Sequence, residues 1–154
     1  MALQIILLLN LLAYSFIISQ SLSYIIALDD VQRKMQPAAY ITFRQLVDKN
    51  FRAKFRYPIY ASLLFSPASA VLALTYNNYF LFVSAIIATI AIVIDTIITI
   101  KKNMPVNDYI NQWTIDNYPA NWQEYRTKWL YYFRWRQIIN ITGFIVLLIG
   151  VIFH

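Results

Sequence analysis

Residues 80–100 read FLFVSAIIATIAIVIDTIITI, an apolar run that contains one acidic residue, Asp95, and is followed directly by Lys101 and Lys102. A helix of this length rises about 31 Å, which matches the hydrocarbon core of a bilayer. No other acidic residue of the chain lies inside an apolar run. The stretch therefore predicts a membrane-spanning helix that carries a single carboxylate.

The composition of the whole chain supports this interpretation. Of its 154 residues, 60% are hydrophobic and 13% are charged, which is too apolar for an ordinary soluble domain. We expect one integral membrane domain over residues 1–154, of the all-α class. The predicted architecture is a bundle of four transmembrane helices with one or two amphipathic interfacial helices on the cytoplasmic side. The spans are predicted at residues 2–28, 58–76, 80–100 and 129–153, and the cytoplasmic loops at 29–57 and 101–128.

The residue inventory excludes several kinds of chemistry. The chain has no cysteine, so it can form no disulfide, thiolate nucleophile or zinc–sulfur site. Its one histidine is the terminal His154, expected to be exposed, so one chain cannot supply two histidines to a haem or a histidine-rich di-iron site. We predict no cofactor, no metal and no nucleic-acid partner. Membrane lipids are the expected partners, and other membrane subunits or self-association stay open.

The distribution of basic residues predicts the topology. All 13 lysine and arginine residues fall between residues 33 and 56 or between residues 101 and 136. By the positive-inside rule both of these regions are cytoplasmic, and both termini lie outside the cytoplasm. The rule also accounts for the net charge of +6. We therefore expect a multi-pass protein of the inner or plasma membrane.

Polar and small residues recur at helical spacing inside three of the spans. Such stripes face protein and leave the bulky aliphatic side chains to lipid. In the first span the stripe consists of Asn10, Tyr14, Ser21 and Tyr24, with Gln20 on an adjacent face. In the third span it consists of Ser84, Ala88, Ala91, Asp95 and Thr99. In the fourth span it consists of Trp129, Phe133, Arg136, Asn140, Gly143, Leu147 and Gly150.

The second and third spans are predicted to form a tight antiparallel hairpin. Only the short turn at Asn77-Asn78 separates them. Pro67 lies in the middle of the second span, where the missing N–H group and the ring are expected to kink the helix.

The two long loops are predicted to lie at the membrane surface. Pro37 is expected to begin an amphipathic helix, because proline is favoured in the first helical turn. Its basic side chains are expected to face lipid phosphates, namely Arg44, Lys49, Arg52, Lys54 and Arg56. In the other loop Asn107 is predicted to cap a short helix that begins at Asp108. An aromatic belt at headgroup depth is predicted from Trp113, Tyr118, Trp122, Tyr125 and Trp129.

Three short segments of the chain resemble a known family. They are Met104-Pro105-Val106-Asn107, Phe43-Arg44-Gln45 and the spacing from Trp129 to Arg136. Together with the layout they are similar to the anthrone oxygenase-like family of small four-helix membrane proteins, many of which have no assigned activity. The resemblance implies a cofactor-independent oxidation of a lipophilic phenolic or polyketide-type substrate by O₂. The chain departs from the family at Phe133, where members often have a histidine.

Asp95 and Arg136 are the candidate catalytic residues under this resemblance. Asp95 would remove an acidic C–H proton, and Arg136 would stabilise the enolate oxygen. Alternatively the two residues form a structural ion pair, because they lie at matched depths in the bundle. The candidate ligand-binding residues are Tyr14, Gln20, Tyr24, Asn107, Trp129 and Asn140. The sequence favours a structural subunit or a module that binds a lipophilic ligand, with the oxygenase as the alternative, and leaves open whether the protein is an enzyme.

Overall fold

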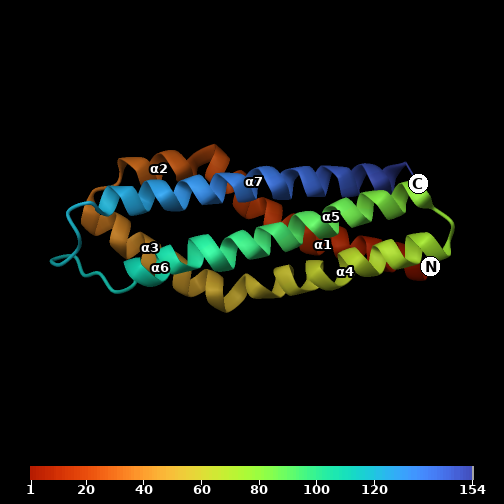
Figure 1. Ribbon diagram of the computed structural model, residues 1–154, viewed down its shortest axis with the longest axis horizontal. Helices are drawn as coiled ribbons and strands as arrows, with labels where there is room; N and C mark the ends of the chain where they lie inside the picture. The colour runs from red at the N-terminus through yellow and green to blue at the C-terminus, as the bar shows by residue number, and fades with distance from the viewer. Residues whose placement is uncertain (154) are drawn as a thin grey trace.

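Helices form almost all of the computed structural model, which describes residues 1–153 (Figure 1). The final residue, His154, and the expectation about it lie outside the described residues. No strand occurs within residues 1–153. In chain order the elements are α1 (Ala2–Ser23), the π-helical segment η1 (Tyr24–Leu28), α2 (Asp29–Lys34), α3 (Pro37–Lys54), α4 (Arg56–Thr75), α5 (Tyr79–Ile98), the π-helical segment η2 (Thr99–Asn103), α6 (Met104–Ile110) and α7 (Trp122–Ile152).

Consecutive elements join into longer continuous helices, and four helices are long and apolar enough to cross a membrane. They comprise Ala2–Lys34, Arg56–Thr75, Tyr79–Ile110 and Trp122–Ile152. The predicted all-α class is thus confirmed, and four helices have at least the length of the predicted spans and their apolar composition. Three of them are longer than the predicted spans, because the continuous helices Ala2–Lys34, Tyr79–Ile110 and Trp122–Ile152 extend into the charged regions.

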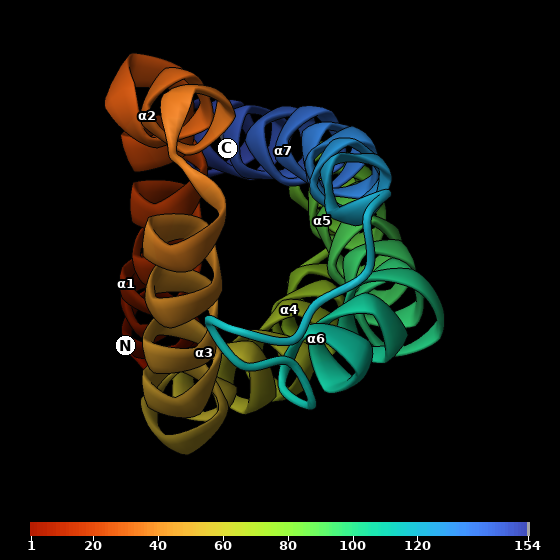
Figure 2. The same ribbon diagram turned by 90° about the vertical axis from the view of Figure 1, so that its left-hand side faces the viewer.

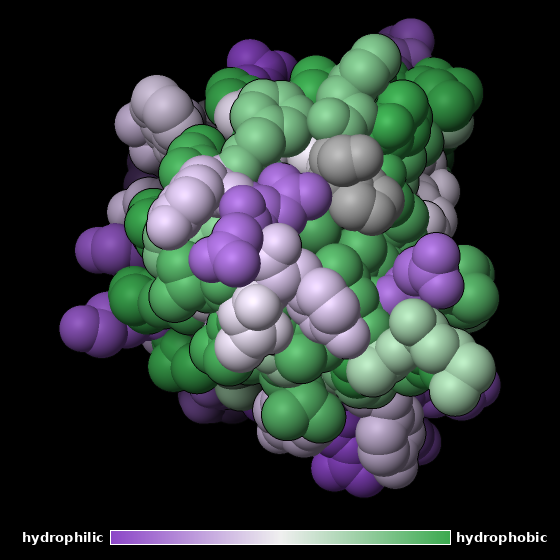
Figure 3. Space-filling view, turned by 90° about the vertical axis from the view of Figure 1, so that its right-hand side faces the viewer, coloured by the Kyte–Doolittle hydropathy of each residue, from purple (hydrophilic) through white to green (hydrophobic). Residues whose placement is uncertain are grey.

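The four long helices pack side by side, with α5 against both α7 and α4, and α1 against α4 and α7. The start of α1, the end of α7 and the α4–α5 turn share one end of the bundle (Figure 1). Figure 3 looks at this end and shows a largely hydrophobic face with a small hydrophilic patch near its centre. At the opposite end α3 runs across the bundle between α2 and α4 (Figure 2). We call the first of these the plain end; it contains the start of α1, the α4–α5 turn and the end of α7. We call the second the elaborated end; it contains α2, α3, α6 and the start of α7.

The tip of the α4–α5 hairpin is held by two asparagines. Asn77 has a φ of 56°, a left-handed conformation that asparagine tolerates better than most residues. The Asn78 side chain caps α5 by accepting a hydrogen bond of 3.0 Å from the N–H group of Leu81. The predicted tight hairpin is confirmed, and its connection is very short.

The predicted stripes face the interior of the bundle. On α5 the side chains of Ser84, Ala88, Ala91 and Asp95 are buried, whereas Ile90 is exposed. All seven residues of the α7 stripe are buried. Both glycines of the stripe permit close approach: a Cβ atom at Gly143 would lie 2.5 Å from the Tyr14 hydroxyl and 2.6 Å from the Ala91 Cβ, and one at Gly150 would collide with Ser84.

Asn10, which belongs to the predicted stripe of the first span, bonds to α4. The Asn10 side chain is fully buried, donates to Ser69 Oγ at 3.2 Å and accepts from Ser66 Oγ at 2.9 Å. These two serines flank Pro67, which lies inside α4. Asn10 therefore ties α1 to the proline-containing part of α4 without leaving its own amide unpaired.

The helix of the third span does not end at residue 100, and the predicted cap at Asn107 is wrong. The helix continues from α5 through η2 into α6, where the N–H group of Met104 donates to the carbonyl oxygen of Thr99. The wider π-helical turn lies just before Pro105, whose ring would otherwise clash with a preceding carbonyl group. Asn107 is consequently the fourth residue of α6 and is not its cap.

Three of the tryptophans lie in a protein core, so the predicted aromatic belt is wrong for them. Trp113, Trp122 and Trp129 are buried in an apolar cluster at the elaborated end. The cluster also contains Tyr40, in which burial raises the pKa to about 12. The physical reason is that α3, α6 and the start of α7 cover one another, which removes these rings from the surface.

Candidate functional site

A cavity of about 550 Å³ lies at the elaborated end. Its walls come from the later part of α1, α3, the start of α4, the end of α5, η2, α6 and α7. The apolar and aromatic part of the lining consists of Val47, Phe51, Phe55, Ile59, Tyr60, Ile100, Met104 and Trp129. The polar part consists of Gln20, Arg44, Asp48, Arg52, Arg56, Thr96, Thr99, Asn103, Asn107 and Arg136. A space of this size can hold an organic molecule.

The cavity reaches the outer surface of the bundle between α4 and η2. Tyr60 and Ile100 line it there, and both side chains are exposed. Each of these residues lies within a helix that is long and apolar enough to span a membrane. The wall on this side is therefore continuous with the apolar surface of the spanning helices.

Arg44 is a buried cation on the cavity wall. Its guanidinium is stacked 3.8 Å from the ring centre of Trp129 and only 2% of the residue is exposed. One Nη donates to the Tyr24 hydroxyl at 3.2 Å, the other donates to Asn107 Oδ1 at 2.7 Å, and Nε has no partner. Within residues 1–153 no carboxylate forms an ion pair with Arg44. Its predicted orientation toward lipid phosphates on the surface is wrong.

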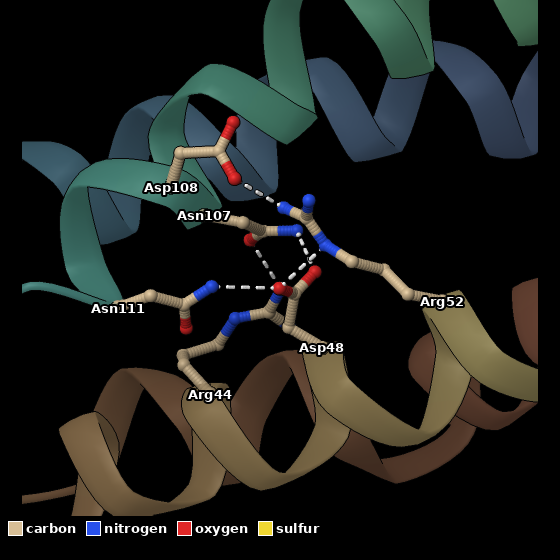
Figure 4. A network of polar contacts seen from close by, with 6 residues as sticks. All are labelled: Arg44, Asp48, Arg52, Asn107, Asp108 and Asn111. Atoms are coloured by element: carbon tan, nitrogen blue, oxygen red, sulfur yellow. Dashed lines mark hydrogen bonds and ion pairs between the residues drawn. The ribbon is translucent and has the colours of Figure 1, made fainter.

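Asp48 is the centre of a polar network that joins α3 to α6 (Figure 4). It accepts hydrogen bonds from Arg52 Nε at 2.8 Å, Asn107 Nδ2 at 2.7 Å and Asn111 Nδ2 at 2.8 Å. Arg52 also bonds to Asp108 at 2.6 Å. These donors satisfy the Asp48 carboxylate, so it is not available to neutralise a further cation.

Asp95 and Arg136 form an ion pair deeper in the bundle. Arg136 Nε lies 2.7 Å from Asp95 Oδ1, and the two side chains are 7% and 0% exposed. Arg136 also reaches Asn103 Oδ1 at 3.5 Å, whereas Asp95 Oδ2 is buried without a hydrogen-bond partner. Arg136 lines the cavity and Asp95 does not, so a ligand in the cavity would meet the guanidinium and not the carboxylate.

The structure divides the residues predicted for the site into two groups. Gln20, Asn107, Trp129 and Arg136 line the cavity. Tyr14, Tyr24, Asp95 and Asn140 are buried but do not line it. Tyr14 instead donates to the carbonyl of Ala88 at 3.4 Å, and Tyr24 packs on Trp129 and Phe133.

The sequence reasoning missed Arg44 and Asp48 as inward-facing site residues. A signal was present, because Tyr40, Arg44 and Asp48 recur every four residues and so share one face of α3. The prediction instead turns Arg44 toward lipid phosphates, because the segment is rich in basic residues. Asn103 was also missed, since it follows two lysines and lies beyond the apolar run.

The fold is that of a helical multi-pass membrane protein, and its cavity is lined by both apolar and charged side chains. Comparisons of the chain with models of known protein families, with curated proteins and with solved structures found no match.

Proposed function

We propose that this protein is a membrane module that binds a lipophilic molecule in the cavity between α3, α4 and α5–α6. The observation that carries the proposal is the cavity itself, because its wall opens onto the apolar surface at Tyr60 and Ile100. A ligand dissolved in the bilayer could enter there without crossing water. The aromatic and aliphatic side chains of the lining would then replace the contacts that the ligand made with lipid.

Co-purification tests this proposal. The full chain is purified in a mild neutral detergent, and bound small molecules are extracted and measured by mass spectrometry. Val47→Trp places a large ring in the cavity wall, and Leu46→Trp adds the same ring at the adjacent, exposed position of α3. We expect a lipophilic species in a fixed molar ratio with the native chain and with Leu46→Trp, and its loss from Val47→Trp. Equal recovery from all three would contradict the proposal.

We also propose that the elaborated end faces the cytoplasm. Every lysine and arginine of the chain falls in or next to the segments that build that end, between residues 33 and 56 or 101 and 136. The plain end carries the α4–α5 turn and no basic residue. The positive-inside rule supports an orientation with both termini outside the cytoplasm, in an inner or plasma membrane.

A second candidate function is the cofactor-independent oxidation implied by the anthrone oxygenase-like resemblance. It is favoured by one observation, the unpartnered Oδ2 atom of Asp95 behind Arg136. To act as a base, Asp95 would have to reach a substrate proton past the guanidinium. Asp95→Asn would then abolish O₂ consumption with an anthrone substrate while the protein stays folded.

A further inference from the structure

We propose that the polar end of the ligand is an anion, a carboxylate or a phosphate carried on a lipophilic chain, and that Arg44 and Arg56 bind it. This inference rests on the ligand-binding function proposed above and specifies the chemistry of the ligand. It follows from the way in which the charges around the cavity are paired.

Arg44 provides the first argument. A cation that is 2% exposed loses nearly all of its hydration, and such groups are normally paired with a carboxylate. Here the partners are a hydroxyl, an amide oxygen and an indole ring, all of them neutral. The Nε–H group, which has no partner, remains as a donor on a residue of the cavity wall. An anion in the cavity would supply the missing counter-charge.

The other charged groups leave an excess of positive charge. The wall contains four arginines, of which Arg52 bonds to Asp48 and Asp108, and Arg136 bonds to Asp95. Counting these three carboxylates against four guanidinium groups leaves one positive charge uncompensated. Arg56 has no carboxylate partner within the described chain and bonds only to the Tyr57 hydroxyl. It is exposed at the start of α4, where an entering headgroup would meet it first.

The apolar wall supplies the argument for a chain attached to the anion. Phe51, Phe55 and Ile59 lie within the lining, alongside the exposed pair Tyr60 and Ile100. A free inorganic anion would make no use of this surface. An amphiphile would place its head among the arginines and its chain along the aromatic and aliphatic wall, toward the lipid.

Trp129 offers a direct readout, because it lines the cavity and stacks on Arg44. The full chain in a neutral detergent is titrated with dibrominated stearate, a fluorescence quencher, at mildly alkaline pH. Dibrominated stearyl alcohol is the neutral probe with the same chain. The Trp135→Phe background removes the one tryptophan whose side chain is exposed on a span. Inorganic phosphate is added in a separate competition.

We expect saturable quenching by the acid, much weaker quenching by the alcohol, and no competition from phosphate at matched concentration. Arg56→Gln and Arg44→Gln should each weaken acid binding about tenfold, as expected for the loss of one charge-assisted hydrogen bond. Lys49→Gln removes an exposed cation of α3 that does not line the cavity, and it should leave binding unchanged. Arg56 is exposed, so its variant stays informative if Arg44→Gln does not fold.

The outcomes separate this inference from the function on which it rests. Equal saturable quenching by acid and alcohol, or no effect of Arg56→Gln, would show that the arginines do not recognise an anionic group. The cavity would then remain a site for a neutral lipophilic ligand. Displacement of the acid by phosphate at equal concentration would overturn the amphiphile in favour of a soluble anion. Failure of both brominated probes to bind would remove the proposed function as well.

Discussion

At the scale of single residues, the Asp95–Arg136 pair places two charges in the apolar interior of the bundle. Each charge on its own would be strongly disfavoured in an apolar interior, and the pair offsets part of that cost through its 2.7 Å contact. The unpartnered Oδ2 atom means that the compensation is incomplete. The pair therefore specifies which faces of α5 and α7 meet more than it adds net stability.

Removing one partner of this pair should destabilise the protein more than removing both. We expect Arg136→Gln to lower the free energy of unfolding by about 3–5 kcal/mol, because it leaves a buried carboxylate without a counter-ion. The double variant Asp95→Asn/Arg136→Gln should recover most of this loss, since both groups are then neutral. Thermal unfolding in detergent measures the difference. Equal losses in the single and double variants would contradict an unpaired carboxylate as the cause of the destabilisation.

Residue-level prediction from the sequence succeeded where an unusual residue type occurs in an apolar run. Asp95 is conspicuous for this reason, and its inward orientation is confirmed by its complete burial. Arg44 was placed wrongly because it lies in a segment rich in charge, where a buried arginine looks like its neighbours. Arg44 differs from the neighbouring basic residues only because α6 packs onto α3 and covers it. That contact joins residues about 60 positions apart in the sequence.

At the scale of helices, the close contact of α5, α7 and α1 depends on the absence of a side chain at Gly143. With lipid on the outside, helices associate by packing and hydrogen bonding, so small residues at the contact are favoured. The Tyr14 hydroxyl and the Ala91 methyl group fill the space beside this glycine. Three helices therefore meet at one position.

Gly143→Ala is expected to destabilise the bundle by about 1–3 kcal/mol, as an overpacked core does. The direction of this stability change is informative, because helix propensity alone would make the alanine variant more stable by about 1 kcal/mol. Combining it with Ala91→Gly should restore part of the loss by removing one of the two close contacts. Ile145→Ala, at an exposed position of α7, is the matched control and should change stability far less. Thermal unfolding in detergent provides the comparison.

Helix faces could be predicted from the sequence, whereas helix ends could not. The stripes on α5 and α7 follow from residue spacing alone, which tertiary contacts do not alter. The continuation of α5 through η2 was missed because two lysines and Pro105 look like a helix terminus. A π-helical turn accommodates the proline, and α6 is held to α3 by the Asp48–Asn107 hydrogen bond of 2.7 Å. Both effects depend on the folded partner.

At the scale of the whole molecule, charge is separated along the bundle axis. The elaborated end contains α2, α3, α6 and the buried aromatic cluster, whereas the plain end has only chain termini and a short turn (Figure 1). The overall division could be read from the sequence because it depends only on where lysine and arginine occur. The cavity could not, since it arises from the way in which α3 crosses the end of the bundle (Figure 2).

The orientation can be tested directly, because the chain contains no cysteine that would have to be removed first. Asn77→Cys places a thiol at the hairpin turn, and Lys49→Cys places one on the exposed side of α3. In intact cells, we expect a membrane-impermeant maleimide to label Asn77→Cys and to leave Lys49→Cys unlabelled until the membrane is opened. The reverse pattern would contradict the proposed topology.

The brevity of the α4–α5 turn has a consequence for biosynthesis. Because Asn77 and Asn78 close the turn with a left-handed residue and a side-chain cap, this hairpin has no hydrophilic loop of its own to pass through the hydrocarbon. The two helices can thus be released into the bilayer as one preformed unit. In the orientation proposed above, the charged segments before and after the hairpin both stay on the side where the ribosome makes them.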